Sequence, residues 1–296
     1  MKRFTRPLMF LAASIGFTPL VSATEGGGTV VPVGVQTIAS GVLQAPGDYL
    51  LNYNLWMTAN KFADANGNNA LPGGRLRVEA HSLRYLHVFE GATLFGATPA
   101  FEVATAYVDS RLNSTYVNGR DHALGDTSFG PSLGWHDANL HQMASALLVA
   151  PTGSYDNTRT VNIGRNYYAL QLDYAVSYFF GPGIEASAMT KVIFNRRNPA
   201  TDYKSGTESD VDYALNWHPT REAFVGLGGY WHRQWTDDKV AGVVYDGGHR
   251  VRDLAIGPQA GWATDRYGVY VAWQKQIDSA NTTKGNLLWV NAFFKF

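Results

Sequence analysis

Alternating apolar and polar positions dominate the chain from Tyr49 onward. In residues 168–178, the side chains of one parity are apolar or aromatic, while those of the other parity are small or polar. Residues 184–195 and 210–217 repeat this pattern. A period of two is that of a β-strand, in which successive side chains point to opposite faces. One apolar face with aromatic residues near its ends, opposite a polar face, is typical of a transmembrane strand.

About twelve such segments follow one another, and each matches or exceeds the ~9–11 residues that a tilted strand needs to cross a bilayer. They are residues 48–58, 75–89, 99–109, 125–136, 140–151, 166–179, 183–195, 207–217, 221–235, 250–263, 267–277 and 285–296. Their connections alternate between long polar stretches and short turns, with a longer exception around 91–98. Outer-membrane barrels have long outer loops and short periplasmic turns, whereas a soluble sandwich has no reason to alternate in this way. The sequence therefore predicts an all-β fold, an antiparallel transmembrane β-barrel with both chain ends on the periplasmic side.

The first residues have the features of a secretory signal peptide. Three basic residues precede a mostly apolar stretch, and Val21-Ser22-Ala23 fits the cleavage pattern of small residues. The apolar stretch is too short for a transmembrane helix. We expect residues 1–23 to be a signal peptide, residues 24–47 an N-terminal periplasmic tail or plug, and residues 48–296 the barrel.

The predicted tail carries apolar side chains but has no strand partner among the twelve segments. These side chains are Val30, Val31, Val33, Val35, Ile38, Val42 and Leu43. Leaving them in water would cost about 25 cal/mol per Å² of apolar surface. Insertion into the lumen from the periplasmic side would shelter them and narrow the pore. The glycines and prolines of the tail are equally compatible with a disordered segment.

The composition agrees with a barrel whose wall faces lipid. Charged residues make up 16% of the chain and aromatic residues 13%, whereas soluble domains contain roughly 25% charged residues. With a mean hydropathy of −0.17, the chain has no apolar run after the signal peptide that would form a helical span of about 20 residues. Lys plus Arg and Asp plus Glu are equal at 24 each, so there is no basic excess that would indicate a nucleic-acid partner.

The chain ends on an alternating strand with Phe294 and Phe296 on one face. A terminal aromatic residue in this position looks like the signal that the outer-membrane assembly machinery reads. We therefore expect Phe296 to be an assembly signal. The expected location is the bacterial cell outer membrane. The expected partners are outer-membrane lipid, the barrel-assembly machinery and a small-molecule solute, without nucleic acid.

If the polar faces point inward, they supply the side chains that line the lumen. The predicted lumen-lining residues are Arg75, Arg77, Glu79, Glu102, Asp126, Asp173, Glu185, Lys191, Asp210, Asp212, Asp253 and Lys295. Opposed acidic and basic groups across a water-filled pore would set ion selectivity. The same charges would also pair and fill a narrow lumen, because a barrel of this size lies between the smallest barrels, which side chains fill, and the open porins. Both interpretations remain open.

The acidic residues of three consecutive predicted strands are expected to lie close together. They are Asp173, Glu185, Asp210 and Asp212. Several carboxylates together would bind a hard cation. Pairing with Lys191 and with lumen arginines is the favoured alternative, because buried charges usually find partners.

No motif in the chain predicts catalysis, a metal site or a cofactor. The sequence contains neither Gly-x-Ser-x-Gly nor His-Glu-x-x-His. Residues 64–68 have oxygen ligands at alternate positions, like a calcium loop. However, the turn glycine and the bidentate Glu of such a loop are missing. We expect that the protein is not an enzyme.

Several stretches resemble the family of outer-membrane proteins associated with the meta-pathway of phenol degradation. They include GDTSFGPSLGW at 125–135, VAPTGSYDNTRTVNIGRNYYAL at 149–170 and FNRRNPATDYKSGTESDVDYALNW at 194–217. The resemblance covers nearly the whole mature chain. It implies a barrel with a role in taking up aromatic or other small apolar compounds, and it offers no catalytic residues to transfer.

The function expected from these observations is an outer-membrane channel for passive uptake of small, aromatic or hydrophobic compounds. One alternative is a non-transporting structural or adhesion barrel, which a lumen filled with paired charges would favour. A further alternative, an outer-membrane hydrolase, would need a catalytic triad that the sequence does not present.

Overall fold

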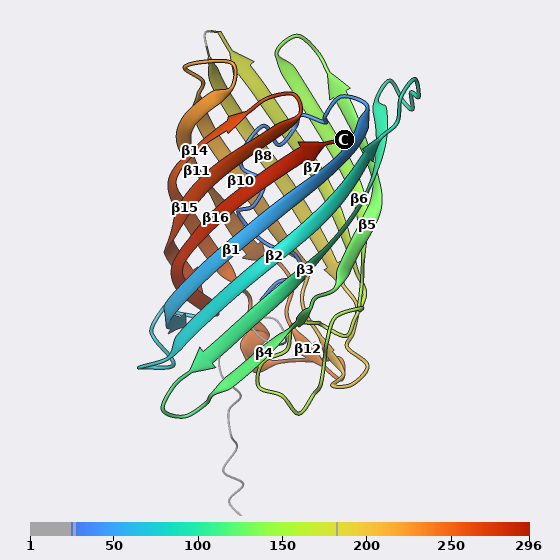
Figure 1. The fold of residues 1–296 in the computed structure, drawn as a ribbon. Coiled ribbons are helices and arrows are strands. Elements are labelled where there is room, and N and C mark those ends of the chain that lie inside the picture. Colours follow the sequence, from blue (N-terminus) through green and yellow to red (C-terminus); the bar gives the residue numbers. More distant parts are fainter. Residues whose placement is uncertain (1–24, 26–27, 182) are drawn as a thin grey trace, which may run out of the picture.

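The computed structural model describes Glu25, residues 28–181 and residues 183–296. The predicted signal peptide, residues 1–23, lies outside the described residues. Antiparallel strands form a closed wall, because β1 pairs with β16 and every strand of the wall pairs with two neighbours. The wall consists of twelve strands, which confirms the predicted β-barrel (Figure 1).

The first six strands of the wall are β1 (Gly47–Ala63), β2 (Arg75–Val88), β3 (Thr98–Asn113), β5 (Thr127–His136), β6 (Leu140–Ala150) and β7 (Ala169–Phe180). The other six are β8 (Ile184–Asn195), β10 (Glu208–Trp217), β11 (Ala223–Gln234), β14 (Arg252–Ala263), β15 (Tyr267–Ala280) and β16 (Thr282–Lys295). No helix among the described residues is long and apolar enough to cross a membrane.

The connections at the two ends of the barrel differ in length, as the sequence predicts. The turns at 137–139, 218–222 and 264–266 are short and lie at the end where β1 begins and β16 finishes (Figure 1). The opposite end carries the long loops. These loops contain a small sheet of β9 (Tyr203–Lys204), β12 (Lys239–Val240) and β13 (Val243–Val244), and the 3-10 helix η1 (Asp246–Gly248).

Two segments that the sequence assigns to long loops are strand in the structure. The segment after residue 110 continues β3 and returns as β4 (Gly119–Leu124), which pairs with β3. Strands β15 and β16 are joined by Asn281 alone, in a left-handed conformation with φ of 53° that asparagine tolerates better than most residues. Continued pairing satisfies the backbone N–H and C=O groups beyond the bilayer, so polar composition alone did not mark the ends of these strands.

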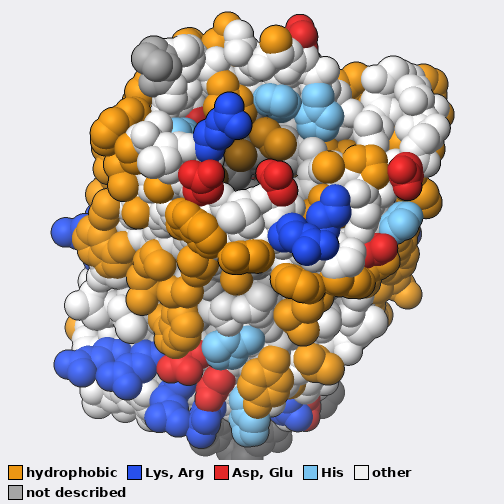
Figure 2. Space-filling view, turned by 45° about the horizontal axis from the view of Figure 1, so that its top comes forward, with side chains coloured by type: hydrophobic (Ala, Val, Ile, Leu, Met, Phe, Trp, Pro, Cys, Tyr) orange, Lys and Arg blue, Asp and Glu red, His pale blue; other side chains and the backbone are white. Residues whose placement is uncertain are grey.

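The outward face of the wall is mostly hydrophobic (Figure 2). In β7, Leu172 and Tyr174 are 42% and 49% exposed, whereas Asp173 between them is only 6% exposed and lies inside. The same alternation puts exposed aromatic or aliphatic side chains on β8, β10, β11, β14 and β15. For this part of the wall, the assignment of faces from the sequence agrees with the structure.

In strand β2 the charged face points outward and the mostly apolar face points inward, so the prediction is wrong for three of the lumen residues. Arg75, Arg77 and Glu79 are exposed on the outer wall, while the alternate side chains Leu76 and Val78 line the interior cavity. Alternation shows which side chains share a face but not which face is inside. These charges lie at the long-loop end of β2, where an outward side chain can reach water and headgroups rather than the hydrocarbon core.

Single cysteines can test the orientation of β2, because the native chain has none. We expect a fluorophore on Leu83→Cys to be quenched by spin-labelled lipid, since Leu83 is 50% exposed on the outer wall. A fluorophore on Ala80→Cys should be quenched by aqueous iodide, since Ala80 lines the interior. The reverse pattern would mean a shift of β2 by one residue, which would return Arg75, Arg77 and Glu79 to the lumen.

Candidate functional site

The segment before β1, residues 28–46, runs inside the barrel along its length (Figure 1); it is called the tail below. Its side chains Val31, Val35 and Leu43 are less than a tenth exposed. At the long-loop end, the carboxylate of Glu25 accepts hydrogen bonds from the side chains of Asn198 and of Thr201. The start of β1 and the end of β16 share the short-turn end as predicted, but the described N-terminal residue lies at the opposite end.

Carboxylates of the wall hold the backbone of the tail. Asp212 on β10 accepts hydrogen bonds from the N–H of Gly34 at 2.6 Å and of Gln36 at 2.9 Å. Glu185 on β8 accepts from the N–H of Ala39 at 2.7 Å. An extended segment without a strand partner needs such acceptors inside a barrel, because a buried N–H without an acceptor is costly.

The wall also donates hydrogen bonds to the carbonyl groups of the tail. The donors and acceptors are Lys191 to Pro32 (3.2 Å), Tyr270 to Val35 (2.8 Å) and Gln274 to Gly34 (2.8 Å). In addition, the hydroxyl of Thr37 donates to the side chain of Gln259 on β14. The tail is therefore tied to the wall through both its donors and its acceptors.

Two glycines let the tail lie directly against the wall. Gly34 has φ of 75°, a conformation that favours glycine. A Cβ on Gly41 would lie 2.5 Å from both the carbonyl oxygen of His141 and the backbone N of Ser177. Gly41 instead donates its N–H to the Ser177 hydroxyl at 2.9 Å. A side chain at either position would push the tail away from its polar partners.

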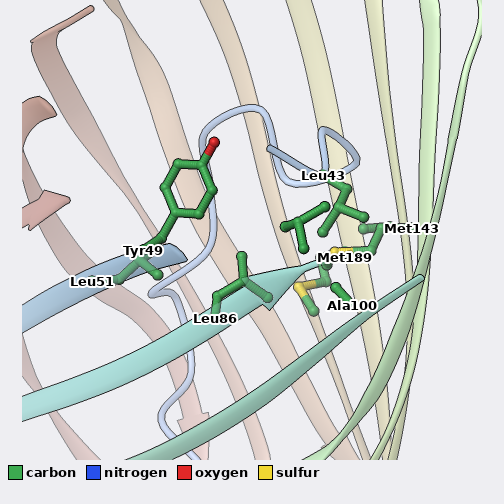
Figure 3. Packing of buried hydrophobic residues seen from close by; sticks show 9 residues of the cluster. Leu43, Tyr49, Leu51, Leu86, Ala100, Met143 and Met189 are labelled. Carbon is green, nitrogen blue, oxygen red and sulfur yellow. The ribbon is translucent and has the colours of Figure 1, made fainter. Parts of the chain in front are cut away.

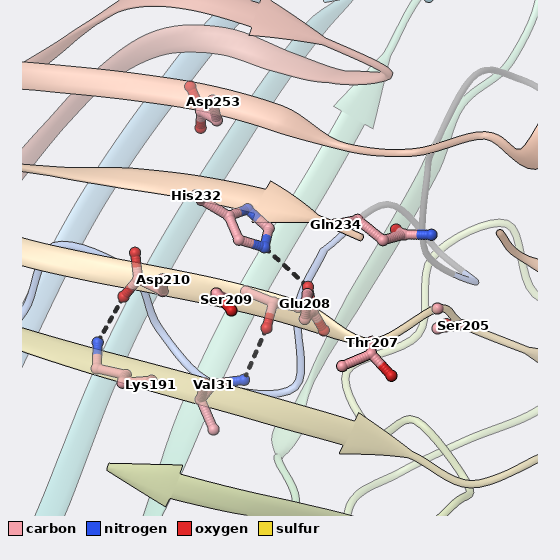
Figure 4. A network of polar contacts seen from close by, with 12 residues as sticks. Val31, Lys191, Ser205, Thr207, Glu208, Ser209, Asp210, His232, Gln234 and Asp253 are labelled. Atoms are coloured by element: carbon pink, nitrogen blue, oxygen red, sulfur yellow. Dashed lines mark hydrogen bonds and ion pairs between the residues drawn. The ribbon is translucent and has the colours of Figure 1, made fainter. Parts of the chain in front are cut away.

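Two of the four acidic side chains predicted to lie close together share one partner, and the other two have partners of their own. Lys191 binds Asp210 at 2.7 Å and Asp212 at 2.9 Å, all three buried (Figure 4). Asp173 accepts from the Gln171 amide, and Glu185 binds His218, Ser187 and Asn216 beside the tail. Among the described residues, no group of three or more acidic, His or Cys side chains is arranged to hold a metal ion.

The remaining predicted lumen residues lie at different depths. Glu102 is buried in an ion pair with Arg84 of β2. Asp126 accepts from the backbone of Gly153 and Arg165 in a long loop. Asp253 is buried beside Tyr230 and Gln276. Lys295 lies at the short-turn end, where its ammonium group contacts the carbonyl of Pro46, and Phe296 is 66% exposed there.

Apolar side chains pack together in the short-turn half of the lumen (Figure 3). Leu43 of the tail belongs to a cluster with residues of six wall strands. Its members are Leu43, Tyr49, Leu51, Leu86, Val88, Ala100, Met143, Ala175 and Met189. Leu43 packs where Gly134 leaves room, because a Cβ on Gly134 would lie 2.4 Å from that of Leu43. We call this group the Leu43 cluster.

A cavity of about 890 Å³ occupies the other half of the lumen and reaches the long loops. One side of it is mostly apolar and consists of inward residues of the neighbouring strands β1, β2 and β3, together with valines of the tail, with Ser82 and Ser110 and the Arg84–Glu102 ion pair among them. The apolar strand residues are Leu55, Met57, Leu76, Val78, Ala80, Ala104, Ala106, Val108 and Leu112. We call them the apolar wall. The opposite side is polar and includes Asp173, Lys191, His232 and Asp253.

Sequence reasoning missed the apolar wall and three of the buried polar residues. Arg84 and Leu86 are two residues apart in β2 and therefore lie on the same face of the strand. The inward position of Arg84 follows only once this face, which is mostly apolar, is recognised as the inner one. His232 lies two residues after Tyr230 on β11, on the same face, and both are buried. The ring of His232 contacts the Glu208 carboxylate at 2.8 Å (Figure 4). The polar residues His232 and Gln234 at alternate positions of β11 were the sequence signal that could have indicated a buried partner for Glu208.

A buried carboxyl group organises the loops at the mouth of the cavity. Asp238 accepts hydrogen bonds from the Tyr203 hydroxyl, the Gly206 N–H and the Gln234 amide. Burial raises the pKa of Asp238 to about 6, because desolvation penalises the charged form more than these donors stabilise it. A raised pKa means that the folded loops bind this proton more tightly than the unfolded chain. The contribution to stability is therefore present at low pH and is lost as the pH rises through about 6.

Comparison with known proteins gives a family and a fold. The family model described as "Putative MetA-pathway of phenol degradation" matches residues 59–292, and no curated protein matches the sequence. An outer-membrane channel from Pseudomonas putida F1 is similar in structure, with a TM-score of 0.77 and 16% identity over 86% of this chain and 97% of that one. The β domain of the Bordetella autotransporter BrkA has a TM-score of 0.53 and 8% identity, over 86% and 100%. The fold is that of outer-membrane barrels, which confirms the predicted location.

Replacing Asp212 should loosen the tail without opening the barrel wall. In Asp212→Asn, one of the two carboxylate oxygens becomes a nitrogen that cannot accept, so one tail N–H loses its acceptor. A hydrogen bond to a charged group contributes about 1.5–3 kcal/mol, so amide exchange at Gly34 or Gln36 should be faster by roughly tenfold or more. Asp278→Asn, which removes a partner of Arg252 on the outer wall, is the control and should leave tail exchange unchanged. Unchanged exchange in Asp212→Asn would show that this carboxylate does not hold the tail.

Proposed function

The chain belongs to the family described as "Putative MetA-pathway of phenol degradation", and we propose that it is a channel for passive entry of small apolar and aromatic compounds across the outer membrane. The observation that carries this proposal is the apolar wall that borders the cavity. A lumen for hydrophilic solutes has no use for three adjacent strands of inward aliphatic side chains, because these offer a solute no hydrogen bonds.

The dimensions of the cavity support a small solute. A volume of about 890 Å³ lies within the ~300–1,000 Å³ of cavities that bind small molecules. One side gives a flat aromatic ring apolar contact, and the polar side gives its hydroxyl or carboxyl substituents partners. The similar Pseudomonas channel has the same fold. The proposed substrate class is argued from the side chains of this chain alone.

The tail acts as the gate in this proposal. Leu43 and its cluster lie between the cavity and the short-turn end, and in this proposal they close the passage between the two. A solute in the cavity therefore reaches the periplasm only when Leu43 and its neighbours move. Non-covalent contacts hold the tail, so such movement needs no change in the barrel wall.

The paired charges favour one alternative to transport. Lys191 with Asp210 and Asp212, and His232 with Glu208, fill the polar side of the lumen, as expected for a structural barrel that presents its loops. A structural barrel does not account for the cavity and its apolar wall. We propose a channel without catalytic activity.

A charge on the apolar wall tests the proposed substrate class. We expect Val78→Asp to lower the entry of phenol into liposomes by roughly tenfold, which corresponds to about 1.4 kcal/mol, because the carboxylate and its water replace an apolar surface. Potassium conductance through the same protein should stay equal or rise. Val78→Thr, which is similar in size and uncharged, is the matched control and should have a small effect.

Two outcomes of this experiment would contradict the proposal. Equal loss of phenol entry and of potassium conductance would mean that the substitution blocks or distorts the lumen. Unchanged phenol entry in a folded variant would mean that the apolar wall does not guide the solute, and the structural alternative would then be favoured.

Removing the tail tests the gate. A variant that lacks residues 25–46 but keeps the preceding residues should assemble, because the closure of the barrel rests on strand pairing from Gly47 onward. We expect its single-channel conductance in a planar bilayer to rise several-fold, since the Leu43 cluster loses its central member. Conductance equal to that of the full chain, in a barrel with normal heat-modifiable migration, would show that the tail does not restrict passage.

A further inference from the structure

We propose that the outer wall carries a binding site for the phosphate groups of the glycolipid in the outer leaflet, at the long-loop ends of β16, β1, β2 and β3. Five outward basic side chains define the site, which we call the outer basic patch. They are Lys61, Arg75, Arg77, Arg111 and Lys284. Figure 2 shows basic side chains gathered at the lower left of the wall, with acidic side chains beside them.

Strand register places like charges directly opposite each other in this patch. Arg77 faces Arg111 across β2 and β3, and Lys61 faces Lys284 across β1 and β16. Like charges in directly opposite positions destabilise a sheet. Glu79 and Asp109 face each other at the next outward position of β2 and β3 and offset part of the repulsion between the arginines, and an anion from outside the chain would offset the rest.

The five patch residues lack the close carboxylate partners that other outward basic residues have, although Asp64 lies near Lys61 and Asp109 near Arg111. Arg120 is paired with Asp109, and Arg252 with Asp278. None of the five patch residues has an ion pair with another described residue within 4.0 Å. Glu79 of β2 and Asp109 of β3 follow on the same face. Because Asp109 is paired with Arg120, the five basic side chains keep a net positive charge.

The surface of the patch is hollowed. A depression of about 210 Å³ lies between β2, β1 and β16. The depression is lined by Arg75 and Arg77, by Thr58, Asn60 and Asn286, and by the apolar residues Ala59 and Leu76. Guanidinium groups bind phosphate oxygens in a two-pronged geometry, and amide and hydroxyl groups donate to the remaining oxygens. This combination of donors suits a phosphate monoester.

Position in the membrane identifies the source of the phosphate. The patch lies outside the barrel, so a solute in the lumen does not reach it. It lies at the end with the long loops, which faces the cell exterior in outer-membrane barrels. The outer leaflet there consists of lipopolysaccharide, whose lipid A portion carries phosphate groups at the depth of a barrel rim. Basic side chains at such a depth bind lipid phosphates through charge and hydrogen bonding.

Binding of purified lipid A to the detergent-solubilised full-length protein tests this site. Native mass spectrometry in the presence of a chelator, which removes bridging divalent cations, would measure the dissociation constant. We expect Arg75→Gln combined with Arg77→Gln to weaken binding roughly 30-fold, equivalent to about 1 kcal/mol for each removed charge. Arg252→Gln is the matched control, because it removes an outward basic side chain at the same end that has its own carboxylate partner. This control should change binding by less than about threefold.

Lipid A stripped of its phosphates and phosphatidylethanolamine complete the design, and both should bind far more weakly than intact lipid A. Equal binding of intact and stripped lipid A, or equal losses in the double variant and the Arg252→Gln control, would overturn the proposal. If the double variant fails the heat-modifiability test for folding, Lys61→Gln with Lys284→Gln replaces it with the same expected direction. Solute flux through the lumen should stay unchanged, so this test is independent of the proposed channel function.

Discussion

The backbone N–H and C=O groups of the tail need hydrogen-bond partners inside the barrel, and this requirement determines how the surrounding side chains are arranged. The tail is extended, and its N–H and C=O groups have no strand partner, so the wall must supply acceptors and donors in a water-poor interior. Asp212 and Glu185 supply the acceptors, and Lys191 supplies a donor while it compensates the charge of Asp212. The carboxylates, the lysine and the tail therefore depend on one another. Any one of them alone would be a buried group without its partner.

The division of the lumen into a polar side and an apolar side follows from this arrangement. The tail lies against β7, β8, β10 and β14, whose inward side chains are polar because they bind its backbone. On the other side, the hydroxyl of Tyr49 on β1 donates to the carbonyl of Ala45 near the end of the tail. Farther from that end, the inward positions of β1, β2 and β3 are mostly aliphatic, and they border the cavity with Val78 and its neighbours. A conventional alternation of apolar outside and polar inside thus holds for one half of the wall and fails for β1 and β2.

This division also explains which parts could be predicted from the sequence. The period of two and the alternating loop lengths were sufficient for the strands, and Asp173 and Tyr174 were assigned to the correct faces because the alternation there follows the usual rule. Arg75, Arg77 and Glu79 were misplaced because the rule assumes a polar lumen, and only tertiary contacts show that the lumen beside β2 is apolar. The apolar content of the tail indicated that it needs shelter, but its polar partners come from strands more than 130 residues away in the chain, a pairing that local patterns do not contain.

The energetic order of the tail contacts indicates where the lumen opens in the proposed channel. Releasing Gly34, Gln36 and Ala39 from their carboxylates costs about 1.5–3 kcal/mol for each hydrogen bond and leaves buried charge without its partners. Displacing Leu43 costs about 1.5–3 kcal/mol in total, because it exposes one aliphatic side chain. An apolar solute that enters the Leu43 cluster offsets part of that cost, since it covers the same surface. In the proposed channel, the polar contacts therefore act as a fixed anchor and the Leu43 cluster as the moving part. The apolar surface of a solute then favours both its entry into the cavity and its passage past the Leu43 cluster.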